Sequence, residues 1–478
     1  IFLSATRYKL NDYRPLLFKS TSGGKKWISI NGDYPKTEIS RVIREDPTRP
    51  GLLYVGSETG IFLSNNSGKN WQKLGGNFPV VPVYDLKIKQ DDLIVGTHGR
   101  SFWILDDLTP LREFTQKFSR NKKGSHGNVQ FFPPKTTFRR TLNWSVNLFL
   151  GDGKNYSPDF GMPGTHYEET TPEGEKRLRY LDMGENPPEG VILNYFLESE
   201  TQETMELVIL DGKGVKIDRF FSNNSSNDPI GIENKEDDEK LSLPTKAGFN
   251  RFVWNMRYPG PEVKIDKSLE KPSYKPLGRG EALPDGGPVA PPGKYQVQLK
   301  LGKIEITRSF EITKDPRLKT STKDFDLQFE LWSKIVNQVS ATNSAINKVR
   351  KLNLQISEFL SRKIFTSPVP SKSSNSVRKA AESLMKKLSQ IESLLTQNQY
   401  ETPSDRLRHP TMLKQRMEAL VSVVSVSDAA PPKQAHAVYK VLSNEIEKQL
   451  TNLKKLEEKE LLQLNKQIDQ AGIPKLTD

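Results

Sequence analysis

The feature that most constrains the fold is an eight-residue pattern that occurs twice near the start of the chain. The octet Ser20-Thr21-Ser22-Gly23-Gly24-Lys25-Lys26-Trp27 returns 44 residues later as Ser64-Asn65-Asn66-Ser67-Gly68-Lys69-Asn70-Trp71. A strand-like run precedes each copy, and Ser, Asn and Gly are residues that form tight turns. A spacing of about 40 to 45 residues is typical of one four-stranded blade of a β-propeller. We therefore predict that propeller blades lie at the start of this chain.

A third unit lacks the octet. Residues 92–105 repeat the two-strand pattern, but they end in Asp106-Asp107-Leu108 where the turn would stand. We interpret residues 1–120 as the last blades of a propeller. Three units cannot close a ring of roughly four to eight blades. Because the chain opens in a strand-like run without Met, we expect a preceding segment or another chain to complete the ring.

The octet residues have turn chemistry that explains each of them without catalysis. Ser and Asn side chains bond turn amides, Gly adopts a positive φ, and Trp is expected to seal the hairpin against its own blade. We therefore predict a structural role for Ser20, Gly24, Trp27, Ser64, Asn66, Gly68 and Trp71.

The middle of the chain, residues 127–315, has the pattern of an all-β domain. Strands are predicted at residues 190–197, 205–210 and 294–301, with Pro and Gly between them. These strands favour an immunoglobulin-like β-sandwich with Trp254 in its core. Residues 151–188 have no clear period, so we predict a long loop, ordered or facing a partner, inserted into this domain.

The last part, residues 320–478, is predicted to be an α-helical bundle. Ser321 followed by Asp324 is a capping signal, and apolar stripes at helical spacing follow it. The stripes indicate four helices, with a Ser/Pro/Lys linker at 367–376 and a helix start after Pro431-Pro432. No run in the chain approaches the roughly 18 to 20 apolar residues that cross a bilayer, so no transmembrane segment is expected.

Candidate chemistry lies between the octets, in residues that the inner strand ends of a propeller would bring to its central channel. Glu58, His98, Arg100 and Arg44 would place an acid, an imidazole and guanidinium groups around one pocket. An acid near an arginine suits work on a glycosidic bond. The alternative is that Arg41, Arg44 and Arg100 form structural ion pairs with Glu45, Asp46 or Asp106, and no second catalytic carboxylate follows from the spacing.

Metal and nucleic-acid sites are not indicated. The chain has no Cys, and His98, His126, His166, His409 and His436 form no zinc-binding pattern. The acidic run Glu236-Asp237-Asp238-Glu239 would bind Ca²⁺ weakly or form a solvated loop, and we expect no other cofactor. The net charge of +13 is spread without a long Lys/Arg run, which argues against nucleic acid as a partner.

The octets resemble the Asp-box, or BNR repeat, with the pattern S-x-[D/N]-x-G-x-x-W. Ser22 stands at the acidic position of the first copy and makes that box degenerate. Residues 248–258 and 290–295 resemble the signature of immunoglobulin-like modules in flagellar hook-capping proteins, which serve as spacers or docking units. Taken in order with Thr97 to Leu111 and Gly184 to Pro188, these segments resemble the carboxy-terminal half of a bacterial family of large BNR-repeat proteins, often called sortilin-like or glycosyl hydrolase-like.

The resemblance implies a bacterial protein that is secreted or belongs to the cell envelope. It leaves two functions open. The first is a non-catalytic binding or scaffold protein, which presents a propeller face to a protein or glycan. The second is a glycoside hydrolase that acts on complex polysaccharide, with Glu58, His98, Arg100 and Arg44 lining part of its site.

Overall fold

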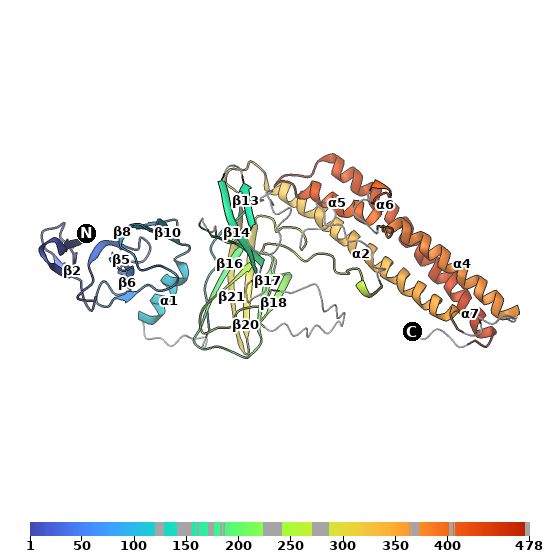
Figure 1. The fold of residues 1–478 in the computed structure, drawn as a ribbon, viewed down its shortest axis with the longest axis horizontal. Coiled ribbons are helices and arrows are strands. Elements are labelled where there is room, and N and C mark those ends of the chain that lie inside the picture. The colour runs from blue at the N-terminus through green and yellow to red at the C-terminus, as the bar shows by residue number, and fades with distance from the viewer. Residues whose placement is uncertain are drawn as a thin grey trace. The chain divides into compact units, whose positions relative to one another are not determined.

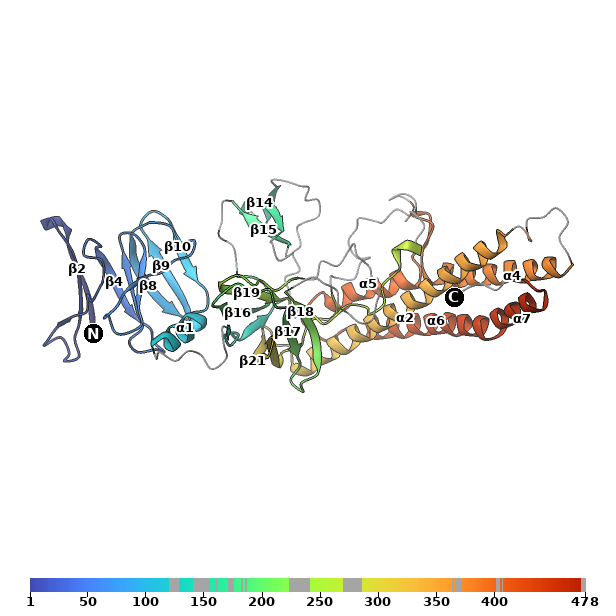
Figure 2. The same ribbon diagram turned by 90° about the horizontal axis from the view of Figure 1, so that it is seen from below.

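The chain forms two compact units, one mainly of strands and one mainly of helices (Figures 1 and 2). A computed structural model describes residues 1–119, 129–140, 155–159, 162–170, 176–181, 184, 187–222, 241–269, 286–362, 365, 372–400, 405 and 407–473. The first unit comprises Ile1–Thr137, Phe149–Asn255 and Lys294–Glu311, and the second comprises Phe138–Leu148, Met256–Gly293 and Ile312–Asp478. The predicted combination of several β-sheets with carboxy-terminal helices is confirmed.

Three small antiparallel sheets come first along the chain. The first sheet contains β1 (Phe2–Arg7), β2 (Asp12–Lys19) and β3 (Ile28–Ser29), with the short helix η1 (Tyr8–Leu10) in its first hairpin. The second contains β4 (Ser40–Glu45), β5 (Leu53–Ser57), β6 (Ile61–Ser64) and β7 (Gln72–Lys73). The third contains β8 (Val83–Lys89), β9 (Asp92–Thr97) and β10 (Phe102–Leu105), and helix α1 (Thr109–Ser119) follows it.

Apolar layers hold the three sheets together. The layer between the first and second sheets contains Leu17, Ile30, Tyr34, Ile43, Leu53, Val55, Phe62 and Trp71. The layer between the second and third sheets contains Val42, Leu52, Tyr54, Ile61, Leu63, Val83, Leu86, Leu93, Val95 and Leu108. Since burying one such side chain stabilises a fold by about 1.5–3 kcal/mol, these layers are the main force that stacks the sheets.

Both octets form the turn that follows a strand. The Oγ of Ser20 accepts a hydrogen bond from the backbone N of Gly24 at 2.9 Å, and the Oγ of Ser64 accepts the same bond from Gly68 at 2.9 Å. Gly24 and Gly68 have φ values of 89° and 86°, which favour glycine because it lacks a Cβ. The two turns are therefore built by the same residue types in the same way.

The degenerate position of the first octet keeps the turn bond. In the second octet, the Oδ1 of Asn66 accepts from the backbone N of Asn70 at 2.9 Å. In the first, the hydroxyl of Ser22 accepts from the backbone N of Lys26 at 2.8 Å. A hydroxyl can replace the amide here because the turn requires only a short side-chain acceptor.

The two octet tryptophans differ in their surroundings. Trp71 is 7% exposed, and its Nε1 donates to the carbonyl of Ile30 at 3.0 Å. Its ring also meets the ring of Tyr34 edge-on at 5.6 Å. Trp71 therefore contacts the segment that follows the first sheet, whereas the sequence predicted that it seals the hairpin against its own blade. Trp27, at the corresponding position of the first octet, is 41% exposed.

This difference gives a matched pair of substitutions. We expect Trp71→Ala to lower the free energy of unfolding of the β-rich unit by about 3–5 kcal/mol, because it leaves a cavity between two sheets. Trp27→Ala should cost less than about 1 kcal/mol, since much of its ring faces solvent. Urea denaturation followed by far-UV circular dichroism measures both, and equal losses would contradict the placement of the two rings.

Two further sheets pack face to face. One has the order β11 (Val129–Phe131), β16 (Val191–Leu197) and β19 (Gly248–Trp254). The other has the order β12 (Thr137–Arg139), β21 (Ile304–Lys314), β20 (Gly293–Leu301), β17 (Met205–Leu210) and β18 (Lys216–Phe221). Trp254 is buried between them, with its ring 6.1 Å from that of Phe310 and 6.2 Å from that of Tyr295. The predicted strands and the predicted core position of Trp254 are confirmed.

The predicted loop at 151–188 is wrong in part. The described residues of this segment include the antiparallel strands β13 (Asn155–Asp159), β14 (Met162–Thr170) and β15 (Lys176–Tyr180), which form a sheet of their own. These strands are rich in Glu, Arg, Lys and Tyr and lack the apolar alternation of a half-buried strand. The segment therefore lacks the apolar alternation from which a strand can be predicted.

The second unit is mainly helical. Its helices are α2 (Thr322–Leu360), α4 (Lys372–Leu395), α5 (Leu413–Ser425) and α6 (Lys433–Lys455), which continues through a π-helical turn, η4 (Leu456–Leu461), into α7 (Leu462–Gln470). The predicted capping box of Ser321 and Asp324 is present, and α6 begins directly after Pro432. The predicted linker at 367–376 is helical from Lys372 onward. None of the described helices is long and apolar enough to span a membrane.

A polar face of α2 holds the backbone of residues 263–266. Ser340, Asn343 and Asn347 lie three and four residues apart, so they share one side of the helix. Their side chains make four hydrogen bonds to main-chain atoms. The Oγ of Ser340 accepts from the N of Val263 at 2.9 Å, and the Nδ2 of Asn343 donates to the O of Val263 at 2.9 Å. The Nδ2 of Asn347 donates to the O of Lys264 at 2.7 Å, and its Oδ1 accepts from the N of Asp266 at 2.9 Å. This segment is therefore fixed through its peptide groups.

A buried arginine joins several segments of the second unit. The side chains of Arg139 and Asp428 are 3% and 2% exposed and form an ion pair at 2.9 Å. Arg139 also contacts the carbonyls of Val289 and Ala290, at 3.2 Å each, the Oε1 of Gln328 at 2.5 Å, and the ring of Phe325 at 4.9 Å. The guanidinium is thus hydrogen-bonded on all sides, which a buried charge requires.

Removal of this arginine should therefore be costly. We expect Arg139→Leu to lower the free energy of unfolding of the helical unit by about 3–5 kcal/mol, because Asp428 is left buried without its cation. The exposed pair of Lys454 and Glu458, 3.8 Å apart, offers a control, and Lys454→Leu should cost less than about 1 kcal/mol. Denaturation followed by the helical circular dichroism signal compares them. The double change Arg139→Leu with Asp428→Leu should recover part of the loss, and no recovery would argue against the buried charge as its cause.

Candidate functional site

Glu58 lies just after β5, in the hairpin that leads to β6. Both the Nε and an Nη atom of Arg41, on β4, contact its Oε1. The side chains of Arg41 and Glu58 are 18% and 28% exposed, so the pair is largely shielded from water. The partner of Glu58 is therefore Arg41, for which the sequence offered a structural ion pair as the alternative interpretation.

The guanidinium of Arg41 also lies against aromatic rings. Its carbon is 4.6 Å from the ring centroid of Tyr84 and 5.2 Å from that of Tyr8. The ring of Tyr84 stacks in turn on His98, with centroids 5.0 Å apart and planes 19° apart. Tyr8, Arg41, Glu58, Tyr84 and His98 thus form one group, called here the Arg41 cluster.

The cluster joins two predicted candidates through Arg41, which was expected only in a structural ion pair, and through Tyr84, which was not predicted. Glu58 and His98 are 40 residues apart in the sequence, and Arg41 and Tyr84 link them. Tyr84 was missed because a tyrosine in a strand is usually a packing residue. The only signal for it is its position: it follows Val83, which is buried, so strand alternation turns its ring to the opposite, exposed face.

The electrostatics of the cluster favour a fixed cation. Burial of Arg41 opposes its charge, but the hydrogen bond to Glu58 and the attraction of that carboxylate outweigh burial and raise the pKa of the guanidinium above its ordinary value. Arg41 therefore stays charged and Glu58 acts as a hydrogen-bond acceptor. Both contacts use the carboxylate of Glu58 as an acceptor, whereas a general acid must donate a proton.

Arg44 and Arg100 are bound elsewhere. Arg44 pairs with Asp85 at 2.7 Å, in an ion pair whose side chains are 45% and 68% exposed. The predicted partners of Arg41 and Arg44 were therefore wrong, since Arg41 pairs with Glu58 and Arg44 with Asp85, and Asp46 pairs with Arg112 at 2.9 Å. The reason is that Arg44, like Val42, lies on the face of β4 toward the third sheet, so the neighbouring carboxylate comes from β8 rather than from the next residues in the chain.

Arg100 belongs to the turn between β9 and β10. Its carbonyl accepts a hydrogen bond from the Nε1 of Trp103 at 2.9 Å, and its backbone N donates to Thr97 at 3.1 Å. Gly99, with φ of 89°, completes this turn. Within the described part of the chain, the guanidinium of Arg100 makes no hydrogen bond or ion pair with the Arg41 cluster. The four predicted candidates are thus only partly brought together.

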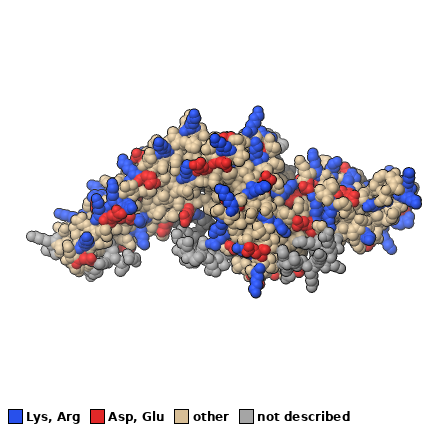
Figure 3. Space-filling model, turned by 180° about the vertical axis from the view of Figure 1, so that it is seen from behind, with Lys and Arg blue, Asp and Glu red and all other residues tan. Residues whose placement is uncertain are grey.

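Metal and nucleic-acid ligands have little support in the described part of the chain. No group of three His, Asp or Glu side chains there could hold a metal ion. The acidic run 236–239 lies outside the described residues. On the face shown in Figure 3, Lys and Arg side chains are interspersed with Asp and Glu, without a basic stripe of the kind that tracks a phosphate backbone.

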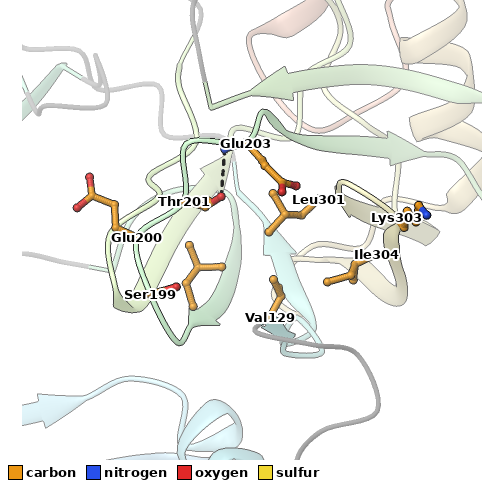
Figure 4. Close-up of a pocket in the computed structure, with 9 residues that line it drawn as sticks. Val129, Ser199, Glu200, Thr201, Glu203, Leu301, Lys303 and Ile304 are labelled. Atoms are coloured by element: carbon orange, nitrogen blue, oxygen red, sulfur yellow. Dashed lines mark hydrogen bonds between the residues drawn. The ribbon is translucent and has the colours of Figure 1, made fainter.

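A separate cavity lies at one end of the two face-to-face sheets (Figure 4). It has a volume of about 380 Å³ and is lined by Val129, Leu197, Ser199, Glu200, Thr201, Glu203, Leu301, Lys303 and Ile304. The backbone N of Glu203 donates to the Oγ1 of Thr201 at 3.1 Å, which shapes one wall. None of the predicted site residues lines this cavity.

Comparisons with known proteins give only distant similarities. No family model and no curated protein matches the chain. A crystal structure of an ancestral GH74 enzyme is 13% identical with a TM-score of 0.14, over 44% of this chain and 23% of that one. Two structures of an extracellular domain from B. thetaiotaomicron, described as a one component and a hybrid two component system, are 9% and 8% identical with TM-scores of 0.16. They cover 63% and 65% of this chain and 29% and 30% of theirs.

The chain therefore spans less than a third of the length of each solved chain that it matches. TM-scores this low do not establish a shared fold. The site must be judged from its own geometry.

The two arginines of β4 test that geometry. We expect Arg41→Met to lower the free energy of unfolding of the β-rich unit by roughly 1–2 kcal/mol, because it removes a shielded ion pair and two ring contacts. Arg44→Met should change it by less than about 0.5 kcal/mol, since its pair with Asp85 is exposed. Thermal and urea denaturation measure both variants. A larger loss for Arg44→Met would show that the Arg41 cluster is not the organising group of this surface.

Proposed function

We propose that the chain is a non-catalytic binding or scaffold protein, whose first three sheets are blades of a β-propeller that presents the Arg41 cluster to a ligand. One observation carries the proposal: the only predicted acid, Glu58, is held by Arg41, while the ring of Tyr84 beside it is 48% exposed. A carboxylate that accepts hydrogen bonds from an arginine is better placed to orient that arginine than to donate a proton to a leaving group.

The chemistry of the cluster fits a glycan better than a flat protein surface. The part of the Tyr84 ring that stays exposed offers apolar surface to a sugar, and His98 and Arg100 supply polar groups in the adjacent turn. Arg100 has no carboxylate partner among the residues that the structure describes, so an anionic sugar would suit this turn. We therefore favour a complex, anionic polysaccharide as the ligand.

The other parts of the proposal rest on the sequence resemblance. The propeller ring is completed by further repeats, from a preceding segment or another chain. The two face-to-face sheets act as an immunoglobulin-like spacer or docking module, and the helices act as an assembly module. The protein works in the bacterial envelope or outside the cell.

A panel of neutral and anionic polysaccharides tests this function. We expect Tyr84→Ala to weaken binding by about ten-fold or more, equivalent to about 1.4 kcal/mol, because an exposed aromatic platform usually dominates such contacts. The control is Tyr13→Ala, which removes a ring that is 51% exposed on β2 and should leave affinity unchanged. Isothermal titration or affinity electrophoresis gives the comparison.

The same panel separates the hydrolase alternative. If the parent chain releases shorter sugars from any of these polysaccharides and Glu58→Gln abolishes release, the protein is a glycoside hydrolase and the proposal is wrong. Binding that depends on Tyr84, without release of product, supports the proposal.

A further inference from the structure

The three sheets are built on one plan, which allows position-by-position comparison. Leu3 on β1, Val55 on β5 and Val95 on β9 occupy equivalent places. The residues opposite them in the adjacent strand are Phe18, Phe62 and Trp103, respectively. The octet tryptophans, Trp27 and Trp71, extend this equivalence to the turn. Each sheet therefore has one face with the same apolar pattern.

This face is covered in two sheets and open in the first. Val55 and Val95 are 0% and 2% exposed, whereas Leu3 is 43% exposed. Trp71 is 7% exposed, whereas Trp27 is 41% exposed. The sequence places the same kind of side chain at both positions, so the difference lies in what covers the face.

The second sheet is covered by residues 30–34, the five-residue segment that follows the first sheet. The carbonyl of Ile30 accepts from the indole of Trp71 at 3.0 Å, and the Oδ1 of Asp33 accepts from its backbone N at 2.6 Å. The ring of Tyr34 lies 4.7 Å from that of Phe62. We call this stretch, with its equivalents, the covering segment.

The third sheet is covered in a similar way. Residues 74–78 stand 44 positions after residues 30–34. Phe78 takes the place of Tyr34, and its ring meets that of Trp103 edge-on at 5.3 Å. The ring contact between one sheet and the covering segment of the sheet before it therefore occurs twice.

The first sheet is open at a second place as well. In the described chain, β4 and β8 pair with β5 and β9, but β1 has β2 as its only neighbour and lies at the edge of its sheet. The open face and the open edge adjoin each other. An unpaired strand edge beside an exposed apolar face is a ready site for β-sheet docking.

We propose that this surface docks a further β-sheet of the same repeat type, which supplies a covering segment to Trp27 and a strand to β1. The inference rests on the proposed propeller and names the surface at which it continues. The partner must offer a carbonyl to the indole of Trp27, an aromatic ring to Phe18, and a side-chain oxygen, from an acidic residue or an amide, to the backbone N of Trp27. In the second sheet, Asn70 also binds Asp33, at 2.9 Å. Lys26 stands at that position in the first sheet, so the acidic residue would gain an ion pair.

A second copy of the chain does not fit this description. Both covering segments in the described residues are already used within the chain. The third sheet continues into Leu108, which is buried in its own layer, and then into α1, so it has no spare segment to offer. The occupant is therefore a repeat other than these three.

An extended chain tests the proposal. A copy of residues 37–92 is placed directly before Ile1. It adds a copy of the second sheet, the covering segment that follows that sheet, and a strand equivalent to β8. The measurement is acrylamide quenching of Trp27, taken as the difference between each chain and its Trp27→Phe version. A control extension carries Leu74→Ser, Asn77→Ser and Phe78→Ser in the added copy only.

We expect the extension to reduce quenching of Trp27 several-fold and the control extension to leave it as in the parent. Unchanged quenching in a folded extension would overturn the inference, as would shielding of Trp27 in the parent that rises with concentration together with dimer formation in sedimentation. The polysaccharide assay on the same chains is independent. Loss of Tyr84-dependent binding with Trp27 shielded would sink only the proposed function, and the reverse result would sink only the docking inference.

Discussion

The contact between one sheet and the covering segment of the sheet before it is the interaction on which the amino-terminal part depends. It combines burial of Phe62 and Trp71 with hydrogen bonds from Trp71 to Ile30 and Asp33. The apolar part supplies most of the free energy, and the polar part fixes the register, because an indole and a carboxylate can meet their partners in only one position. The stacking of the sheets is thus specific as well as favourable.

The packing of the second sheet against the third sets the surface that carries most of the Arg41 cluster. Arg41 comes from β4 of the second sheet, and Tyr84 and His98 come from β8 and from the turn after β9 of the third. The cluster exists only because two sheets are held side by side, so its geometry inherits the rigidity of the apolar layer between them. Glu58 then fixes the rotamer of the arginine. Function and packing are therefore joined at the same boundary.

The sequence predicted the elements with strong local signals and missed those that depend on distant partners. The octet turns, the capping box of Ser321 and the alternation that buries Trp254 follow from neighbouring residues, and all three are present. The strands at 155–180 carry no apolar period, so no local rule finds them. The pairing of Arg41 with Glu58, and of Arg44 with Asp85, is decided by which sheet faces which. Spacing in the chain alone does not contain that information.

The side chains of Ser340, Asn343 and Asn347 recognise residues 263–266 through peptide groups, which every amino acid carries. These bonds to the helix therefore do not depend on which side chains the segment carries. Ile265 contributes in another way, because it packs against the helical core. Over evolutionary time such a segment can drift freely at its other positions while keeping its path, and relatives of this chain would share the anchor on α2 long after the anchored sequence has lost any resemblance.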